Sequence, residues 1–159
     1  MFSSGDICGI AVRIEENGER FYREAACHVN EASCKDLLLF IAEEEARHRT
    51  FFLDMKATLP ARGEEWAERM SGRILEDAVA DHAFSLDDTP AESLADGRVI
   101  IRTALGMEED SILFYELLLS FVSDEETSRH IREIIAEERR HVEVLQKLQA
   151  TPRDSEAGA

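Results

Sequence analysis

The chain has 159 residues, of which 44% are hydrophobic and 33% are charged, and this balance is typical of a globular protein with one domain. The net charge of −16 argues against nucleic acid or an anionic membrane as a partner. The three cysteines form no C-x-x-C pair, which argues against a disulfide scaffold and a rubredoxin-type iron site. The N-terminus does not resemble a secretory signal, and no apolar run approaches the roughly 20 residues that span a bilayer. We therefore expect a cytoplasmic protein.

Helical periodicity dominates the N-terminal third of the chain. The spacing of apolar residues predicts a first helix over 4–29 and a second that ends near Thr58, separated by the turn "HVNEAS". Ser33 with Asp36 resembles a capping box, which predicts that the second helix begins there.

Residues 59–96 form a connection far longer than a hairpin loop requires. Trp66, Met70 and Ile74 lie on one stripe, so part of this segment is predicted to be helical and packed. The stripe could cover the bundle as a crossover or form the interface of a homodimer.

Two further helices are predicted after this connection. The third covers about 97–122, and the fourth begins at a capping box of Ser123 with Glu126 and ends near Leu148. The polar tail 150–159 is predicted to be disordered, which leaves 1–149 as the single domain. The predicted fold class is all-α, a four-helix bundle of two helical hairpins joined by a long, partly helical crossover.

An internal repeat relates the two predicted hairpins. "IEENGERFY" (14–22) matches "MEEDSILFY" (107–115), and "EEARH" (44–48) matches "EERRH" (137–141). Both matches have the same offset of 93 residues. The two hairpins therefore align without a gap.

The repeat places one glutamate opposite a Glu-x-x-His pair in each hairpin. In the first hairpin, Glu45 and His48 are three residues apart and share a helix face, and Glu15 and Glu45 are equidistant from the turn. Residues equidistant from the turn of an antiparallel pair lie at the same level, here about 22 Å from the turn. The second hairpin repeats this arrangement with Glu108, Glu138 and His141.

Helix phase selects the inward-facing glutamate of each first helix. Glu15 shares its face with Ala11, Gly18 and Tyr22, whereas Glu16 shares its face with charged residues. The same test selects Glu108, which shares its face with small Ala104 and Ser111, over Glu109. The small neighbours leave room for a metal and for oxygen.

Four carboxylates and two imidazoles would balance two divalent cations, which explains why acidic residues follow the apolar run "LLLFIA". Six protein ligands also leave open coordination positions for small-molecule chemistry. The predicted metal ligands, which would be catalytic through the metals, are Glu15, Glu45, His48, Glu108, Glu138 and His141. Iron, manganese and zinc all accept such ligands.

Other polar residues are interpreted more conservatively. His28, His82 and His130 have no glutamate three positions earlier, so we expect surface or capping roles. Tyr22 and Tyr115 lie on the ligand faces, where packing with a hydroxyl hydrogen bond is favoured over a redox-active tyrosyl.

At these motifs the chain, over about residues 5–148, resembles rubrerythrin-like members of the ferritin-like superfamily. The resemblance implies a four-helix bundle with a dinuclear site, usually of iron, in which Glu45 and Glu138 bridge the metals. The chain departs from rubrerythrins proper at Ser111, where they carry an extra ligand glutamate, and in having no Cys-rich rubredoxin segment. A separate electron-donor protein is therefore expected.

Three functions fit these observations. The first is a di-iron oxidoreductase that acts on O2 or hydrogen peroxide with electrons from that donor. The second is an iron-handling protein, in which oxidation of Fe(II) only loads metal. The third is a structural metal bundle, with zinc for example, and no turnover.

Overall fold

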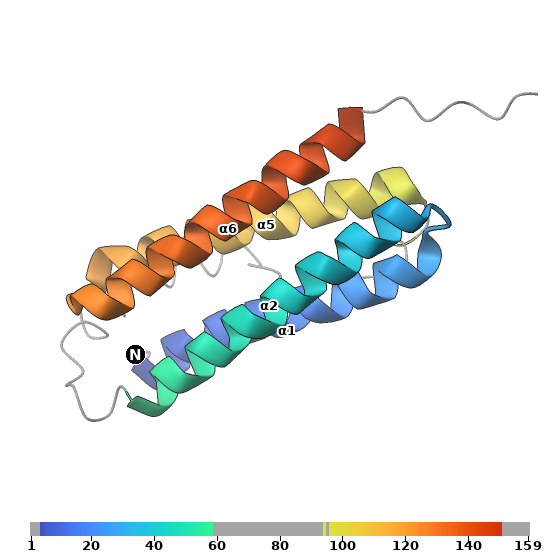
Figure 1. Cartoon of the computed structure of the whole chain (residues 1–159). Coiled ribbons are helices and arrows are strands. Elements are labelled where there is room, and N and C mark those ends of the chain that lie inside the picture. Colours follow the sequence, from blue (N-terminus) through green and yellow to red (C-terminus); the bar gives the residue numbers. More distant parts are fainter. Residues whose placement is uncertain (1–3, 59–93, 95, 151–159) are drawn as a thin grey trace, which may run out of the picture.

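The computed structural model describes residues 4–58, 94 and 96–150, which form four helices and, within these ranges, no strand (Figure 1). The helices are α1 (Ser4–His28), α2 (Ala32–Thr58), α5 (Gly97–Phe121) and α6 (Glu125–Ala150). Helix α1 packs along α2, and α5 along α6, as two antiparallel hairpins. The hairpins meet through contacts of α1 with α5 and of α2 with α6. The predicted all-α four-helix bundle is therefore confirmed.

The 93-residue repeat extends to the ends of the helices. Helix α5 begins and ends 93 residues after α1, and α6 begins 93 residues after α2. The turns are centred on Asn30 and Ser123, the two points from which the sequence predicted equal distances. Helix α6 continues to Ala150, two residues beyond the predicted end.

Both predicted capping boxes are wrong, by two residues at the start of α2 and by one at the start of α6. Helix α2 begins before Ser33, whose hydroxyl donates to the carboxylate of Glu31 at 2.5 Å. At the start of α6, Asp124 takes the capping position predicted for Ser123, and its carboxylate accepts the backbone N–H of Thr127 at 2.9 Å. Aspartate and serine are comparable N-caps, and here the aspartate lies directly before the first helical residue.

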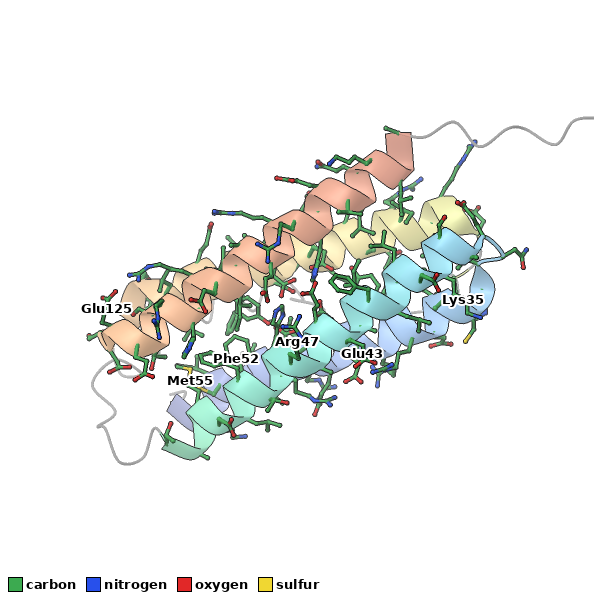
Figure 2. All side chains as sticks on the ribbon, in the orientation of Figure 1. Lys35, Glu43, Arg47, Phe52, Met55 and Glu125 are labelled. Carbon is green, nitrogen blue, oxygen red and sulfur yellow. The ribbon has the colours of Figure 1, made fainter. Side chains whose placement is uncertain are left out.

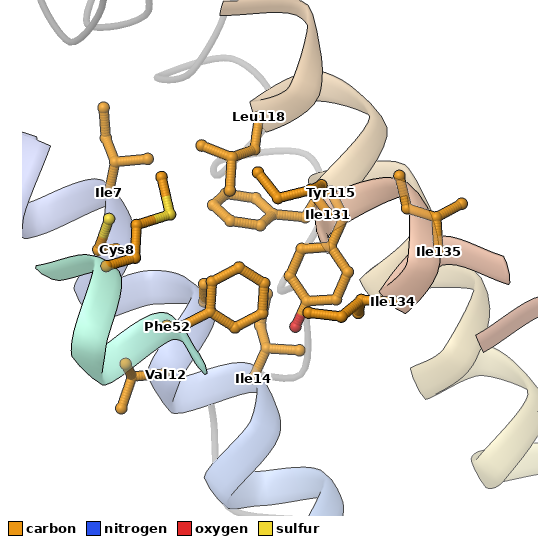
Figure 3. Packing of buried hydrophobic residues seen from close by; sticks show 13 residues of the cluster. Ile7, Cys8, Val12, Ile14, Phe52, Tyr115, Leu118, Ile131, Ile134 and Ile135 are labelled. Atoms are coloured by element: carbon orange, nitrogen blue, oxygen red, sulfur yellow. The ribbon is translucent and has the colours of Figure 1, made fainter. Parts of the chain in front are cut away.

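Two apolar clusters, each drawing on all four helices, fill the bundle. The cluster at the N-terminal end of α1 is shown in Figure 3, and its buried members are Ile7, Cys8, Ala11, Val12, Ile14, Phe52, Met55, Phe114, Tyr115, Leu118, Ile131, Ile134 and Ile135. Phe52 and Met55 bring the last turns of α2 into this cluster (Figure 2). The second cluster lies beyond residue 20 of α1 and includes Phe21, Leu38 and Leu145. The middle of the bundle, between the clusters, is left to polar residues.

Several predictions lie outside the described residues. They concern the crossover with Trp66, Met70 and Ile74, His82, and the tail beyond Ala150. In the part of the chain that is described, no helix is long and apolar enough to cross a membrane.

Candidate metal centre

The six predicted ligands converge at mid-bundle, between the two apolar clusters. Each of them is at most 4% exposed. They form two groups, and within each group one ligand atom per residue lies within 4.8 Å of the others. The first group consists of Glu15, Glu45, His48 and Glu138, and the second of Glu45, Glu108, Glu138 and His141. Glu45 and Glu138 belong to both groups.

Helix phase separates the inward glutamates from their neighbours as the sequence predicted. Glu15 and Glu108 are buried, at 0% and 2% exposure, whereas Glu16 and Glu109 are exposed. A rotation of about 100° per residue turns the next side chain on the helix away from the bundle axis. The equivalent glutamates of α1 and α5 therefore face the same site.

Both histidines direct Nδ1 into the cluster. His48 Nδ1 lies 2.9 Å from Glu138 Oε1, and His141 Nδ1 lies 3.0 Å from Glu138 Oε2. Glu138 thus lies between the two imidazoles, and the Nε2 atoms point away from it.

The Nε2 atoms reach two carboxylates that the sequence analysis did not single out. His48 Nε2 lies 2.7 Å from Glu137 of α6, and His141 Nε2 lies 2.8 Å from Glu44 of α2. Each bond crosses between the hairpins, and each carboxylate is the residue directly before a Glu-x-x-His pair. The doubled glutamate of "EEARH" and "EERRH" was the signal that could have identified them.

The outer carboxylates in turn contact arginines. Glu44 accepts a 2.5 Å hydrogen bond from Arg47, and Arg140 lies 3.5 Å from Glu137. Both arginine side chains are more than half exposed, and Arg47 is visible on α2 in Figure 2. Each histidine is therefore linked through one carboxylate to the protein surface.

Two buried tyrosines also connect the hairpins. Tyr22 of α1 donates its hydroxyl to Glu108 of α5, and Tyr115 of α5 donates to Glu15 of α1. Burial and the neighbouring carboxylate charges raise the pKa of both hydroxyls well above the usual 10. The tyrosines therefore remain protonated donors, and Tyr115 also stacks on Phe52 with 4.9 Å between ring centroids.

The metal-free cluster compensates its own charge with protons. Burial raises the pKa of Glu108, and the charge of Glu138 raises it further, to about 8. Burial and the charges of Glu138, Glu15 and Glu108 raise the pKa of Glu45 well above 4.5. Burial also acts to raise the pKa of Glu138, but the two histidines that flank its carboxylate outweigh burial and lower that pKa below its usual range.

The histidines respond in the opposite sense to burial. Burial lowers the pKa of His48, yet the nearby carboxylates of Glu138 and Glu15 outweigh it and raise the pKa to about 11. Burial likewise lowers the pKa of His141, and Glu108 and Glu138 raise it to about 11. Without metal, the site holds imidazolium ions beside carboxylates.

The donor set fits two divalent cations. Within the described residues, four buried polar atoms of this cluster have no hydrogen-bond partner: Glu15 Oε2, Glu45 Oε1, His48 Nδ1 and Glu138 Oε1. Unpaired polar atoms are costly in a protein interior, and a bound cation would satisfy all of them. Carboxylate oxygen with imidazole nitrogen is a set that iron, manganese and zinc accept.

The remaining candidate residues lie away from this centre. His28 is exposed at the end of α1, and His130 packs edge-on against Phe51 at 5.5 Å between ring centroids. The three cysteines are free thiols, and none belongs to either group of candidate ligands.

Comparisons with known proteins identify the family and the fold of the chain. The family model described as rubrerythrin matches residues 6–149. Among solved structures, a protein from Thermotoga maritima described as ferritin-like and diiron-carboxylate is 26% identical, with a TM-score of 0.69 over 93% of this chain and 95% of that chain. No curated protein sequence matches significantly. The ferritin-like form of the predicted bundle is therefore confirmed.

Proposed function

This chain belongs to the rubrerythrin family, and from that premise we propose that it binds two iron ions and uses them to reduce O2 or hydrogen peroxide with electrons from a separate donor protein. One observation carries the proposal. Six buried candidate ligands from four helices converge, and within the described residues four of their atoms have no hydrogen-bond partner.

The two metal positions would each have a carboxylate and an imidazole of their own. Glu15 and His48 belong only to the first group of candidate ligands, and Glu108 and His141 only to the second. In each pair the glutamate comes from the first helix of a hairpin and the histidine from the second. Each position is therefore assembled only when its hairpin folds.

Two carboxylates would be shared between the positions. Glu45 and Glu138 belong to both groups, and four carboxylates with two neutral imidazoles balance the +4 charge of two ferrous ions. Bound iron would supply the two electrons that reduction of O2 to peroxide, or of peroxide to water, requires. Only small molecules suit this site as substrates, because every ligand side chain is at most 4% exposed.

The outer residues would hold the ligands in one orientation. Glu137 and Glu44 accept the Nε2–H of His48 and His141, which fixes the tautomer that leaves Nδ1 free for a metal. The hydroxyl of Tyr22 donates a hydrogen bond to one carboxylate oxygen of Glu108, and that of Tyr115 donates to one oxygen of Glu15.

Steady-state turnover tests this proposal. Anaerobically iron-loaded protein is mixed with a chemical reductant and either O2 or peroxide, and consumption of the oxidant is followed. We expect many turnovers per site. Oxidation that stops after one equivalent of the site, despite excess reductant, would instead indicate an iron-handling protein. A redox-inert metal in protein from its native host would indicate a structural bundle.

A further inference from the structure

The two halves of the metal centre are built on a repeat, so a difference between them is informative. The ligands, the tyrosines and the outer carboxylates all recur at the offset of 93 residues. The residue three positions after the ligands Glu15 and Glu108 does not recur, because it is Gly18 in α1 and Ser111 in α5.

Glu45 occupies the space that a side chain at position 18 would fill. A Cβ added to Gly18 would lie 2.7 Å from Glu45 Oε2, 3.3 Å from its Cδ and 3.5 Å from its Cγ. The carboxylate of Glu45 therefore lies directly against the backbone of α1. On α5, the equivalent space holds the buried side chain of Ser111, whose hydroxyl donates to the carbonyl of Met107 at 2.9 Å.

The two shared carboxylates consequently lie differently. Glu138 places its two oxygens 2.9 and 3.0 Å from the Nδ1 atoms of His48 and His141. Glu45 places one oxygen against Gly18, and the other lies 3.6 Å from His141 Nδ1 with no hydrogen-bond partner. Glu138 has a hydrogen bond to His141 through Oε2 and lies close to His48 through Oε1, whereas Glu45 lies against the backbone of Gly18.

We propose that Gly18 is a positioning residue for the metal centre, because the space left by its missing side chain places the carboxylate of Glu45 between the two metal positions. This inference rests on the proposed function, since it assumes that Glu45 is a metal ligand. Gly18 makes the two shared carboxylates inequivalent, although the ligand set itself is symmetric.

The displacement that a methyl group would cause is large on the scale of metal coordination. Cβ contacts below 3.0 Å essentially do not occur, and ordinary contacts begin at 3.4 Å, so Gly18→Ala requires Glu45 Oε2 to move by about 0.3–0.7 Å. Metal–ligand distances tolerate about 0.2 Å. Because Glu45 belongs to both ligand groups, both metal positions are affected.

Titration of the metal-free protein with Co(II), followed by its visible absorption, tests the inference. Gly18→Ala is expected to weaken Co(II) binding by about tenfold or more and to change the spectrum. Gly106→Ala is the matched control. It makes the same change in α5, where an added Cβ meets nothing within 4 Å, and it should alter affinity by no more than about twofold.

A double-mutant cycle distinguishes positioning from a general effect on the fold. Glu45→Asp shortens the side chain and withdraws its carboxylate from position 18. In that background, Gly18→Ala should cause little further loss of affinity, and the metal-free double variant should melt no lower than Glu45→Asp alone. The same cycle applies if Gly18→Ala by itself does not fold.

Three results would overturn the inference. The first is that Gly18→Ala binds Co(II) as tightly as the wild type. The second is that Gly18→Ala causes the same loss of affinity in the wild-type and Glu45→Asp backgrounds, and the third is that the double variant fails to fold. Each of them leaves the proposed function intact if the wild-type protein binds two Co(II) ions. A wild-type protein that binds fewer than two ions would overturn the proposed function, and this inference with it.

Discussion

The outer carboxylates Glu44 and Glu137 provide a quantitative test of how the histidines are held. Glu137→Gln and Glu44→Gln each keep the size of the side chain but remove the charge that accepts Nε2–H of His48 or His141, at 2.7 and 2.8 Å. A hydrogen bond to a charged group contributes about 1.5–3 kcal/mol. That range corresponds to roughly a 10- to 100-fold loss of metal affinity, which is the usual effect of removing such a partner from a metal-bound histidine.

The geometry also predicts which change affects which metal position. Glu137→Gln should weaken the position that includes His48, and Glu44→Gln the position that includes His141. Each single variant should therefore show one weakened binding step and one nearly unchanged step. Loss of the Arg47 contact adds little to the effect of Glu44→Gln, because an ion pair with an arginine side chain that is 60% exposed is worth at most about 1 kcal/mol.

Calorimetric titration with Co(II) measures both steps, and Glu43→Gln is the control. Glu43 is next to Glu44, but its side chain is 66% exposed and contacts Arg23 outside the site. If Glu44→Gln weakens binding no more than Glu43→Gln does, or if either change weakens both steps equally, the assignment of the outer carboxylates is wrong.

Two further predictions concern stability. Glu15→Gln relieves repulsion among buried carboxylates but removes a ligand. The melting temperature of the variant should therefore equal or exceed that of the wild type in chelator, and should lie below it with saturating Fe(II). A lower melting temperature in chelator, with the metal-induced rise unchanged, would show that Glu15 is not a ligand. In the metal-free protein, the pKa of His48 and His141 is raised from the ordinary 6.5 to about 11, and that of Glu108 from 4.5 to about 8. Between these values the folded state retains protons that the unfolded chain loses. The free energy of unfolding of the metal-free protein should therefore fall from pH 6.5 to pH 8, by about 1.4 kcal/mol per pH unit for each retained proton. Over the same range the metal-induced rise in melting temperature should grow, because metal binding releases those protons. Thermal melts at both pH values measure this, and a metal-free protein that becomes more stable with increasing pH would contradict it.

The repeat made much of the bundle predictable from the sequence. A constant offset of 93 residues fixed two hairpins of equal length, and equal distances from the turns placed Glu15 at the level of Glu45. Helix phase then distinguished Glu15 from Glu16. These inferences needed only local periodicity and the geometry of an antiparallel pair.

The features that sequence did not predict depend on contacts between packed helices. The bonds of His48 to Glu137 and of His141 to Glu44 join residues 89 and 97 positions apart, and they form only when α2 and α6 meet. The doubled glutamates mark Glu44 and Glu137 as candidates, but only the packing of α2 against α6 determines which histidine each one contacts. The contact of Gly18 with Glu45 also depends on the distance between two packed helices.

Anaerobic titration of metal-free protein with Fe(II) measures how many ions the centre binds. We expect saturation at two ions per chain. Converting both Glu45 and Glu138 to alanine should abolish binding, whereas Glu16→Ala and Glu109→Ala, on the exposed neighbours of the ligands, should leave two ions bound. Saturation of the wild-type protein at one ion or none, or loss of binding in the Glu16 or Glu109 variants, would contradict the dinuclear site.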